Sequence, residues 1–236
     1  MGVAFDDLNM AEALERAAAL AEEKRAAYVV TPNPEIVSAS WNNPALAEAL
    51  RDADLVVPDG VGVVYAARIL GTPLKERVPG IDLATGLFER FSGEEKRVFL
   101  LGAKPGVAEK AAETLQKNWP GLVLCGTHDG YFQEDGPVLE AVNAAAPDLL
   151  LVCLGFPKQE LWMRRNRDKL NVGLMMGLGG VLDVFAGNVQ RAPERWQKLG
   201  LEWLYRLMKQ PSRIGRMAKL PLFLVKAVFR RLSGKN

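Results

Sequence analysis

The stretch that decides the fold is Val56-Val-Pro-Asp-Gly-Val-Gly-Val-Val-Tyr65. An apolar, strand-like run begins at Leu55 and ends at Pro58, which cannot donate a hydrogen bond to a neighbouring strand. After Asp59 and Gly60 the chain enters a second apolar run, which is typical of a helix. Asp59 stands at the turn between the two. In open α/β sheets ligands bind beyond the carboxyl ends of the strands, so a carboxylate here can do chemistry. The simpler alternative is that Asp59 caps the helix, and spacing alone favours the cap.

Strand-like and helix-like segments alternate outward from this turn over residues 1 to about 190. The run 149–154 is apolar throughout, as in strands that are buried on both faces. This alternation predicts an α/β fold with a doubly wound, mostly parallel, Rossmann-like sheet. The predicted strands are 27–30, 55–57, 98–101, 122–125, 149–154 and 172–176, and the main predicted helices are 10–25, 43–50, 82–91, 107–119, 138–146 and 157–170.

The composition is that of a globular protein, with 236 residues, 49% hydrophobic and 25% charged. We find no charged-then-apolar leader and no uncharged apolar run long enough to span a membrane. We therefore expect a cytoplasmic protein. Cys125 and Cys153 each sit in an apolar, strand-like run, which favours buried structural thiols over a disulfide or a metal site.

Charge is distributed unevenly along the chain. Residues 191–236 hold 12 of the 30 Lys and Arg but only 2 of the 28 Asp and Glu. We predict two units, an α/β domain at 1–190 and a basic helical appendage at 191–236. Such a segment suits anionic partners, among them phosphates, lipid head groups and nucleic acid. Its final part, Leu220 to Leu232, mixes apolar and basic residues as in a helix on a membrane surface, and a packed helix with a solvated basic face explains it equally well.

Several other patterns are weaker. Asp52 and Asp54 form an Asp-x-Asp pair of the kind that holds divalent metals, but they precede a strand and so lie at the wrong edge of the sheet. The glycines of 60–62 and 177–180 do not complete a dinucleotide fingerprint, which leaves a nicotinamide oxidoreductase as a weak alternative. His128, the only histidine, sits in a predicted surface loop, so a protein metal cage of the usual kind is not expected.

Five short motifs, in order along most of the chain, resemble those of the TagA/WecG/CpsF family of bacterial glycosyltransferases. Each motif is weak alone, but five at compatible spacing are specific. They are Thr31-Pro-Asn-Pro-Glu35, Pro58-Asp-Gly-Val-Gly62, Arg77-Val-Pro-Gly-Ile-Asp82, Gly155-Phe-Pro-Lys-Gln-Glu160, and Arg191-Ala-Pro193 with Leu201-Glu-Trp203.

The resemblance implies an inverting, metal-independent enzyme that needs no cofactor. It would move an N-acetylmannosamine-type sugar from UDP to a polyprenyl-diphosphate-linked N-acetylglucosamine, in the synthesis of cell-surface polysaccharide or teichoic acid. It would work as a peripheral protein on the inner, cytoplasmic face of the cell membrane. The implied partners are the UDP-sugar, the lipid-linked acceptor and an anionic membrane surface, and not nucleic acid.

The resemblance also assigns roles to residues, by matching positions in the motifs. Asp59 matches the base that takes the proton of the acceptor hydroxyl, which favours the catalytic interpretation over the cap. Without a metal, the departing diphosphate must be met by fixed cations. Thr31, Asn33 and Gln159 match polar residues beside the sugar, Arg77, Arg206, Arg213 and Arg216 match the diphosphate-binding cations, and Tyr131 and Asp183 match residues that hold the uracil.

The appendage has two roles in the family that this chain resembles, since it closes over the site and brings the enzyme to the membrane. Residues 220–236 suit the membrane role and could instead cover a contact in a homo-oligomer. The main alternative function is a non-catalytic nucleotide-binding module that is docked on anionic membrane by its basic tail.

Overall fold

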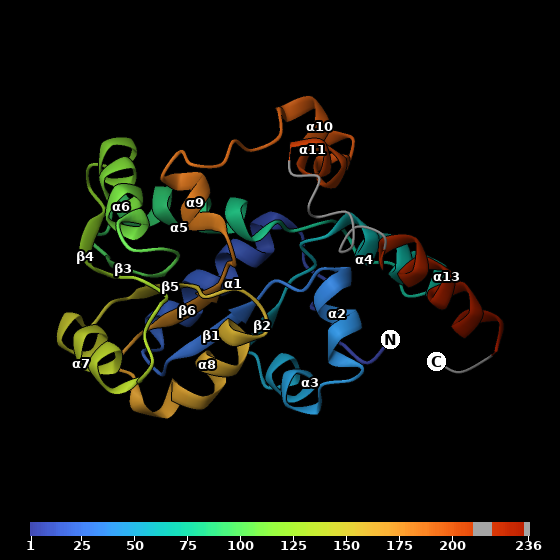
Figure 1. Ribbon diagram of the computed structural model, residues 1–236, viewed down its shortest axis with the longest axis horizontal. Coiled ribbons are helices and arrows are strands. Elements are labelled where there is room, and N and C mark those ends of the chain that lie inside the picture. Colours follow the sequence, from blue (N-terminus) through green and yellow to red (C-terminus); the bar gives the residue numbers. More distant parts are fainter. Residues whose placement is uncertain (210–218, 234–236) are drawn as a thin grey trace.

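Residues 1–209 and 219–233 are described by a computed structural model, apart from the side chains of Lys198, Arg206 and Lys219. A six-stranded sheet crosses the molecule in the order β2-β1-β6-β5-β3-β4, and every neighbouring pair of strands is parallel (Figure 1). This confirms the predicted α/β fold. The strands are β1 (Ala27–Val30), β2 (Leu55–Val56), β3 (Arg97–Gly102), β4 (Val123–His128), β5 (Leu149–Cys153) and β6 (Leu174–Gly177).

Helices cover both faces of the sheet and bury two apolar clusters against it. One face carries α1 (Met10–Glu22), α5 (Gly80–Ser92), α6 (Val107–Asn118) and α9 (Val181–Phe185). The other carries α2 (Pro34–Ser40), α3 (Pro44–Arg51), α7 (Gly136–Ala145) and α8 (Lys158–Asn166), with a 3₁₀ turn at Arg167–Lys169. Sheets of buried parallel strands need this cover on both sides, because neither face can be left to water.

Local sequence signals fix where these helices begin. Asn9 caps α1 in a capping box with Glu12, and Asn43 caps α3 with Pro44 in its first turn. One predicted loop is wrong. Residues 126–128 continue β4, because the backbone of His128 stays paired with β3 at Leu101. Both cysteines are free thiols, and burial raises the pKa of Cys153 to about 12, so that it stays neutral.

Beyond the sheet, the chain forms α10 (Glu194–Lys198), α11 (Glu202–Lys209) and α13 (Lys219–Leu232). α13 lies along α4 (Val61–Leu70) and α2 (Figure 1), where Phe223 stacks on Trp41. None of the helices in the described part of the chain has the length and hydrophobicity that a membrane span needs. The predictions for Arg213 and Arg216 lie outside the described residues.

Candidate active site

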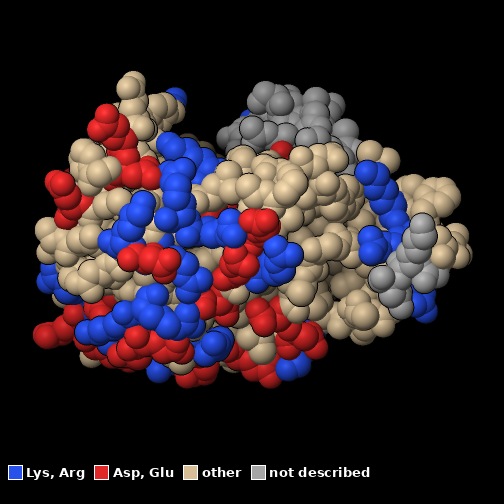
Figure 2. Space-filling view, turned by 90° about the horizontal axis from the view of Figure 1, so that it is seen from below, with Lys and Arg blue, Asp and Glu red and all other residues tan. Residues whose placement is uncertain are grey.

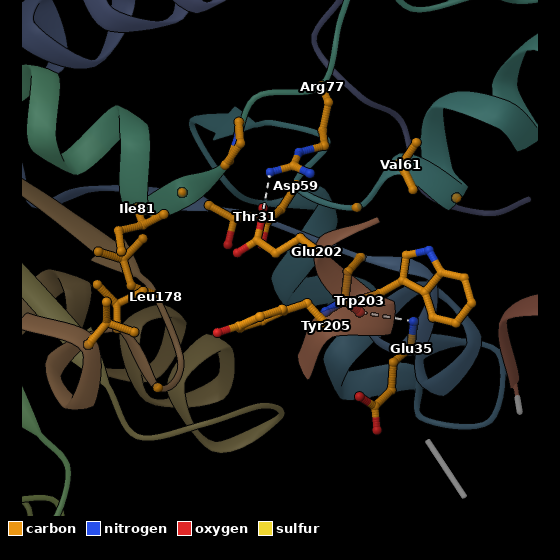
Figure 3. A pocket seen from close by; sticks show the side chains of 18 of the residues that line it. Thr31, Glu35, Asp59, Val61, Arg77, Ile81, Leu178, Glu202, Trp203 and Tyr205 are labelled. Carbon is orange, nitrogen blue, oxygen red and sulfur yellow. Dashed lines mark hydrogen bonds and ion pairs between the residues drawn. The ribbon is translucent and has the colours of Figure 1, made fainter. Parts of the chain in front are cut away.

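A cavity of about 300 Å³ opens at the carboxyl ends of β2, β1 and β6 (Figure 3). The loops that follow these three strands bring Thr31, Asp59 and Leu178 to its wall, and α11 supplies Glu202 and Tyr205. Figure 3 shows the Tyr205 ring pointing into the cavity. The cavity therefore joins residues that are far apart in the sequence, at the sheet edge where ligands of parallel α/β proteins bind.

Thr31 and Asn33 are held rigidly at the end of β1. The Thr31 hydroxyl donates to the Gly177 carbonyl at 3.1 Å, which ties the end of β1 to the end of β6. Asn33 caps α2, with its Oδ1 accepting from the backbone N–H groups of Glu35 and Ile36 at 2.9 and 3.1 Å. Its side-chain NH₂ remains as the group that can donate to a ligand. Both residues line the cavity.

Asp59 also lines the cavity, and it is not the cap of α4. The N-cap is Gly60, one residue later. Gly60 and Gly62 have no room for a side chain, because a Cβ at Gly60 would meet Pro34 Cδ at 2.7 Å and one at Gly62 would meet Leu220 Cδ1 and Pro34 Cγ. Packing within the protein is therefore sufficient reason for both glycines.

Two helix N-termini face the same cavity. The first residues of α4 and α5, including Val61, Gly80 and Ile81, lie in its wall. Among the described residues, neither N-cap, Gly60 nor Pro79, supplies a side-chain hydrogen bond. Uncapped N–H groups and the positive end of the helix dipole make such termini favourable for phosphate groups.

A network of four charged side chains lies at one side of the cavity, and two of them, Arg77 and Glu202, line it. Arg77 donates to Glu202 Oε2 at 3.0 Å, and Arg191 binds both oxygens of Asp82 at 2.5 and 2.8 Å. Burial acts to lower the pKa of Arg191, but the hydrogen bond that it donates to Asp82 and the charges of Asp82, Glu202 and Asp59 outweigh it and leave that pKa raised. Arg191 therefore stays charged.

Gln159 lies behind the cavity wall rather than in it. Its side chain is 3% exposed, accepts from the Gly179 backbone N–H at 2.9 Å and donates to Glu160 Oε1 at 2.9 Å. It thus fixes the 178–180 loop, whose residues Leu178 and Gly180 line the cavity. Burial raises the pKa of the Glu160 carboxyl, and its Oε2 has no hydrogen-bond partner in the described part of the chain.

The two residues matched to the uracil are placed differently. Asp183, in α9, lines the cavity. Tyr131 follows β4 at the far edge of the sheet, is 69% exposed and does not line it. Arg206 belongs to α11, but its side chain lies outside the described residues.

Sequence reasoning missed the roles of Glu202, Arg191 and Asp82. All three stand inside motifs that were recognised, which was the available signal, yet nothing in the spacing pairs residues more than 100 positions apart. Asp54, by contrast, pairs with Arg25 and Arg167 at the opposite edge of the sheet, as a structural carboxylate. The described residues contain no cluster of three or more His, Cys, Asp or Glu that could hold a metal.

Comparison with known proteins places the chain in a family. The family model described as Glycosyl transferase WecG/TagA/CpsF family matches residues 1–236. A Bacillus spizizenii protein named N-acetylglucosaminyldiphosphoundecaprenol N-acetyl-beta-D-mannosaminyltransferase is 37% identical over 203 residues, 86% of this chain and 79% of its own length. A Staphylococcus aureus (strain MW2) protein of the same name is 37% identical over 229 residues, 96% of this chain and 90% of its own. The chain belongs to the WecG/TagA/CpsF family of glycosyltransferases.

Proposed function

We propose that the protein transfers N-acetylmannosamine from a UDP-sugar to N-acetylglucosaminyl-diphospho-undecaprenol, as the names of its relatives describe for them. The observation that carries the proposal is the convergence in one cavity of Asp59, Arg77 and the uncapped N-termini of α4 and α5. A carboxylate beside a cluster of positive groups suits a reaction in which a hydroxyl is deprotonated while a diphosphate departs.

In the proposed reaction, an acceptor hydroxyl oxygen attacks the anomeric carbon of the donor sugar. The bond from that carbon to the diphosphate oxygen breaks, and UDP leaves with the electron pair. Asp59 takes the hydroxyl proton. Arg77 and the two helix termini stabilise the negative charge that develops on the diphosphate. The relatives' name specifies a β-linked sugar, and an α-linked donor would give that product by a single inverting displacement.

Four carboxylate residues line the cavity, Glu35, Asp59, Asp183 and Glu202. Asp59 is proposed as the base because it stands in the Pro58–Gly62 motif at the end of β2. Glu202 is bonded to Arg77 at 3.0 Å and lies 3.8 Å from Arg191 Nε, so its carboxylate is already engaged by two guanidinium groups. Arg206, Arg213 and Arg216 remain proposed diphosphate-binding cations, and Gln159 is proposed to act through the Gly179 loop.

α13 is proposed to rest on the anionic inner face of the membrane that holds the lipid acceptor. Its inner face is packed through Phe223 and Ala227, while Leu222, Phe229 and Leu232 are exposed. Figure 2 shows acidic and basic side chains interspersed over the body of the molecule. On the face shown, the end with α13 carries basic and uncharged residues but no visible acidic ones. An exposed apolar row flanked by cations is the pattern of a helix that lies in a membrane interface.

The activity is tested by incubating the full chain with a panel of UDP-sugars and an N-acetylglucosaminyl-diphosphate lipid, and by measuring product mass. We expect extension by one N-acetylhexosamine from UDP-N-acetylmannosamine, with β configuration by NMR and unchanged rate in EDTA. No extension with any donor would overturn the proposal.

The membrane contact is tested with the double variant Phe229→Ser, Leu232→Ser. It should bind phosphatidylglycerol vesicles about tenfold more weakly or worse, because two exposed apolar side chains no longer enter the bilayer.

A further inference from the structure

Arg191 has a buried donor for which the described residues supply no acceptor. Its two terminal nitrogens are bonded to Asp82, but its Nε is buried and makes no hydrogen bond to any described residue. Glu202 Oε1 lies 3.8 Å from this Nε, which is within ion-pair range but beyond the reach of a hydrogen bond. Buried N–H groups are nearly always paired, so this one calls for an explanation.

Glu202 stands between two guanidinium groups and is bonded to one of them. Its Oε2 accepts from Arg77 at 3.0 Å, and its side chain is largely buried. A shift of about 1 Å would bring Oε1 into hydrogen-bond distance of Arg191 Nε. The carboxylate thus has a second place to bind, in which its charge would remain compensated. That matters because a buried charge that loses its partner is strongly destabilising.

Arg77 is the group for which a ligand would compete. It lines the cavity and, in the proposed function on which this inference rests, binds the donor diphosphate. As long as Glu202 is bonded to Arg77, the carboxylate engages one of its nitrogens and repels any incoming anion. A diphosphate therefore binds Arg77 fully only when Glu202 moves away.

We propose that Glu202 is a two-position carboxylate, which pairs with Arg77 in the empty site and moves onto Arg191 Nε when a nucleoside diphosphate reaches Arg77. Glu202 is a positioning residue that acts through Arg77. It lowers the affinity for the nucleotide, and its return to Arg77 after transfer helps to expel UDP. Arg191 is the receiving group, and Asp82 holds it in place through two hydrogen bonds.

The test is the binding of UDP to the full chain by titration calorimetry, for the wild type, Glu202→Gln, Arg191→Lys and the double variant. Glu202→Gln should bind UDP about fivefold more tightly, because the competing charge is gone. Arg191→Lys keeps a charge but has no Nε at that position, so it should bind UDP about fivefold more weakly. In the Glu202→Gln background, Arg191→Lys should change binding less than about twofold, because coupled residues are not additive.

Each outcome decides a separate statement. The exposed Glu194→Gln, in α10, removes the same charge from the same segment and should leave UDP binding unchanged. Glu202→Gln by itself decides whether Glu202 competes with the nucleotide. If Glu202 only held Arg77 in place, the variant would bind UDP equally or more weakly, and that result would refute the proposal. An equal loss from Arg191→Lys in both backgrounds would remove Arg191 as the receiving group. A wild type that does not bind UDP would instead refute the proposed donor.

Discussion

The two halves of the carboxyl edge of the sheet differ in what they offer a ligand. On one side, the loops after β2, β1 and β6 supply Asp59, Thr31 and Leu178 to the cavity. On the other side, the loops after β5, β3 and β4 contribute no lining residue within the described part of the chain. One half of the sheet edge therefore carries the polar residues of the cavity, and the loops of the other half supply none of its described lining.

Contacts within each half explain the difference. In the second half, Lys158 Nζ donates to the Gly130 carbonyl at 2.9 Å and the Gly130 N–H donates to Ala103, so the loops bind one another. In the first half, α11 places Glu202, Trp203 and Tyr205 over the strand ends. The candidate site is thus built where the C-terminal helices cover the sheet.

Replacement of the proposed base should have the largest effect. We expect Asp59→Asn to lower kcat about 1000-fold while UDP still binds, because the amide cannot accept the hydroxyl proton. The rate of sugar transfer and UDP titration together check this. Asp168→Asn, an exposed change at the opposite edge of the sheet, is the control and should leave the rate unchanged. Normal turnover in the Asp59 variant would remove Asp59 from the base role.

Removal of Arg77, a cation in the cavity wall, should have the next largest effect. Arg77→Met should lower kcat/KM for the donor about 100-fold, since a fixed charge at the departing diphosphate is lost. Lys104→Met removes an exposed cation from the loop after β3, in the second half, and should change kcat/KM less than about twofold. Equal losses in the two variants would mean that the halves do not differ as described.

Features of the fold and the site that depend on residues close together in the sequence could be predicted, and contacts between residues far apart in the sequence could not. All six strands followed from short apolar runs, because burial on both faces of a sheet leaves a local signature. Thr31, Asn33, Asp59 and Arg77 were found through their motifs and do line one cavity. The pairing of Glu202 with Arg77 was not predictable, since the packing of α11 sets it and no local pattern records that packing.

Tyr131 tests whether the ligand reaches the second half. A cavity of about 300 Å³ can hold a sugar and part of a diphosphate, and Asp183 marks its boundary towards α9 and α6. If the uracil extends past that boundary to stack on Tyr131, Tyr131→Ala should weaken UDP binding about tenfold and leave kcat nearly unchanged. Tyr131→Phe keeps the ring and should bind UDP like the wild type. A change below twofold in the alanine variant would confine the ligand to the first half.

Glu160 joins the two halves, because it follows β5 and supports Gln159, which fixes the Gly179 loop after β6. Burial raises the pKa of its carboxyl above the ordinary value of 4.5. Between these two pKa values the folded chain binds more protons than the unfolded chain, so this group's contribution to stability falls as pH rises from about 4.5. Above the raised pKa, the protein carries an ionised carboxylate whose Oε2 has no partner among the described residues.

Glu160→Gln should therefore stabilise the protein, by about 1 kcal/mol or 2–4 °C in Tm at pH 8, and by little or nothing at pH 4. The glutamine keeps Oε1 as the acceptor for Gln159 and resembles the protonated acid, so the loop geometry is preserved. Thermal unfolding of both proteins across this pH range measures the difference. Glu140→Gln, an exposed change on α7, should give no such trend. A loss of stability at pH 8 would show instead that the ionised carboxylate is needed to hold the loop that connects the two halves.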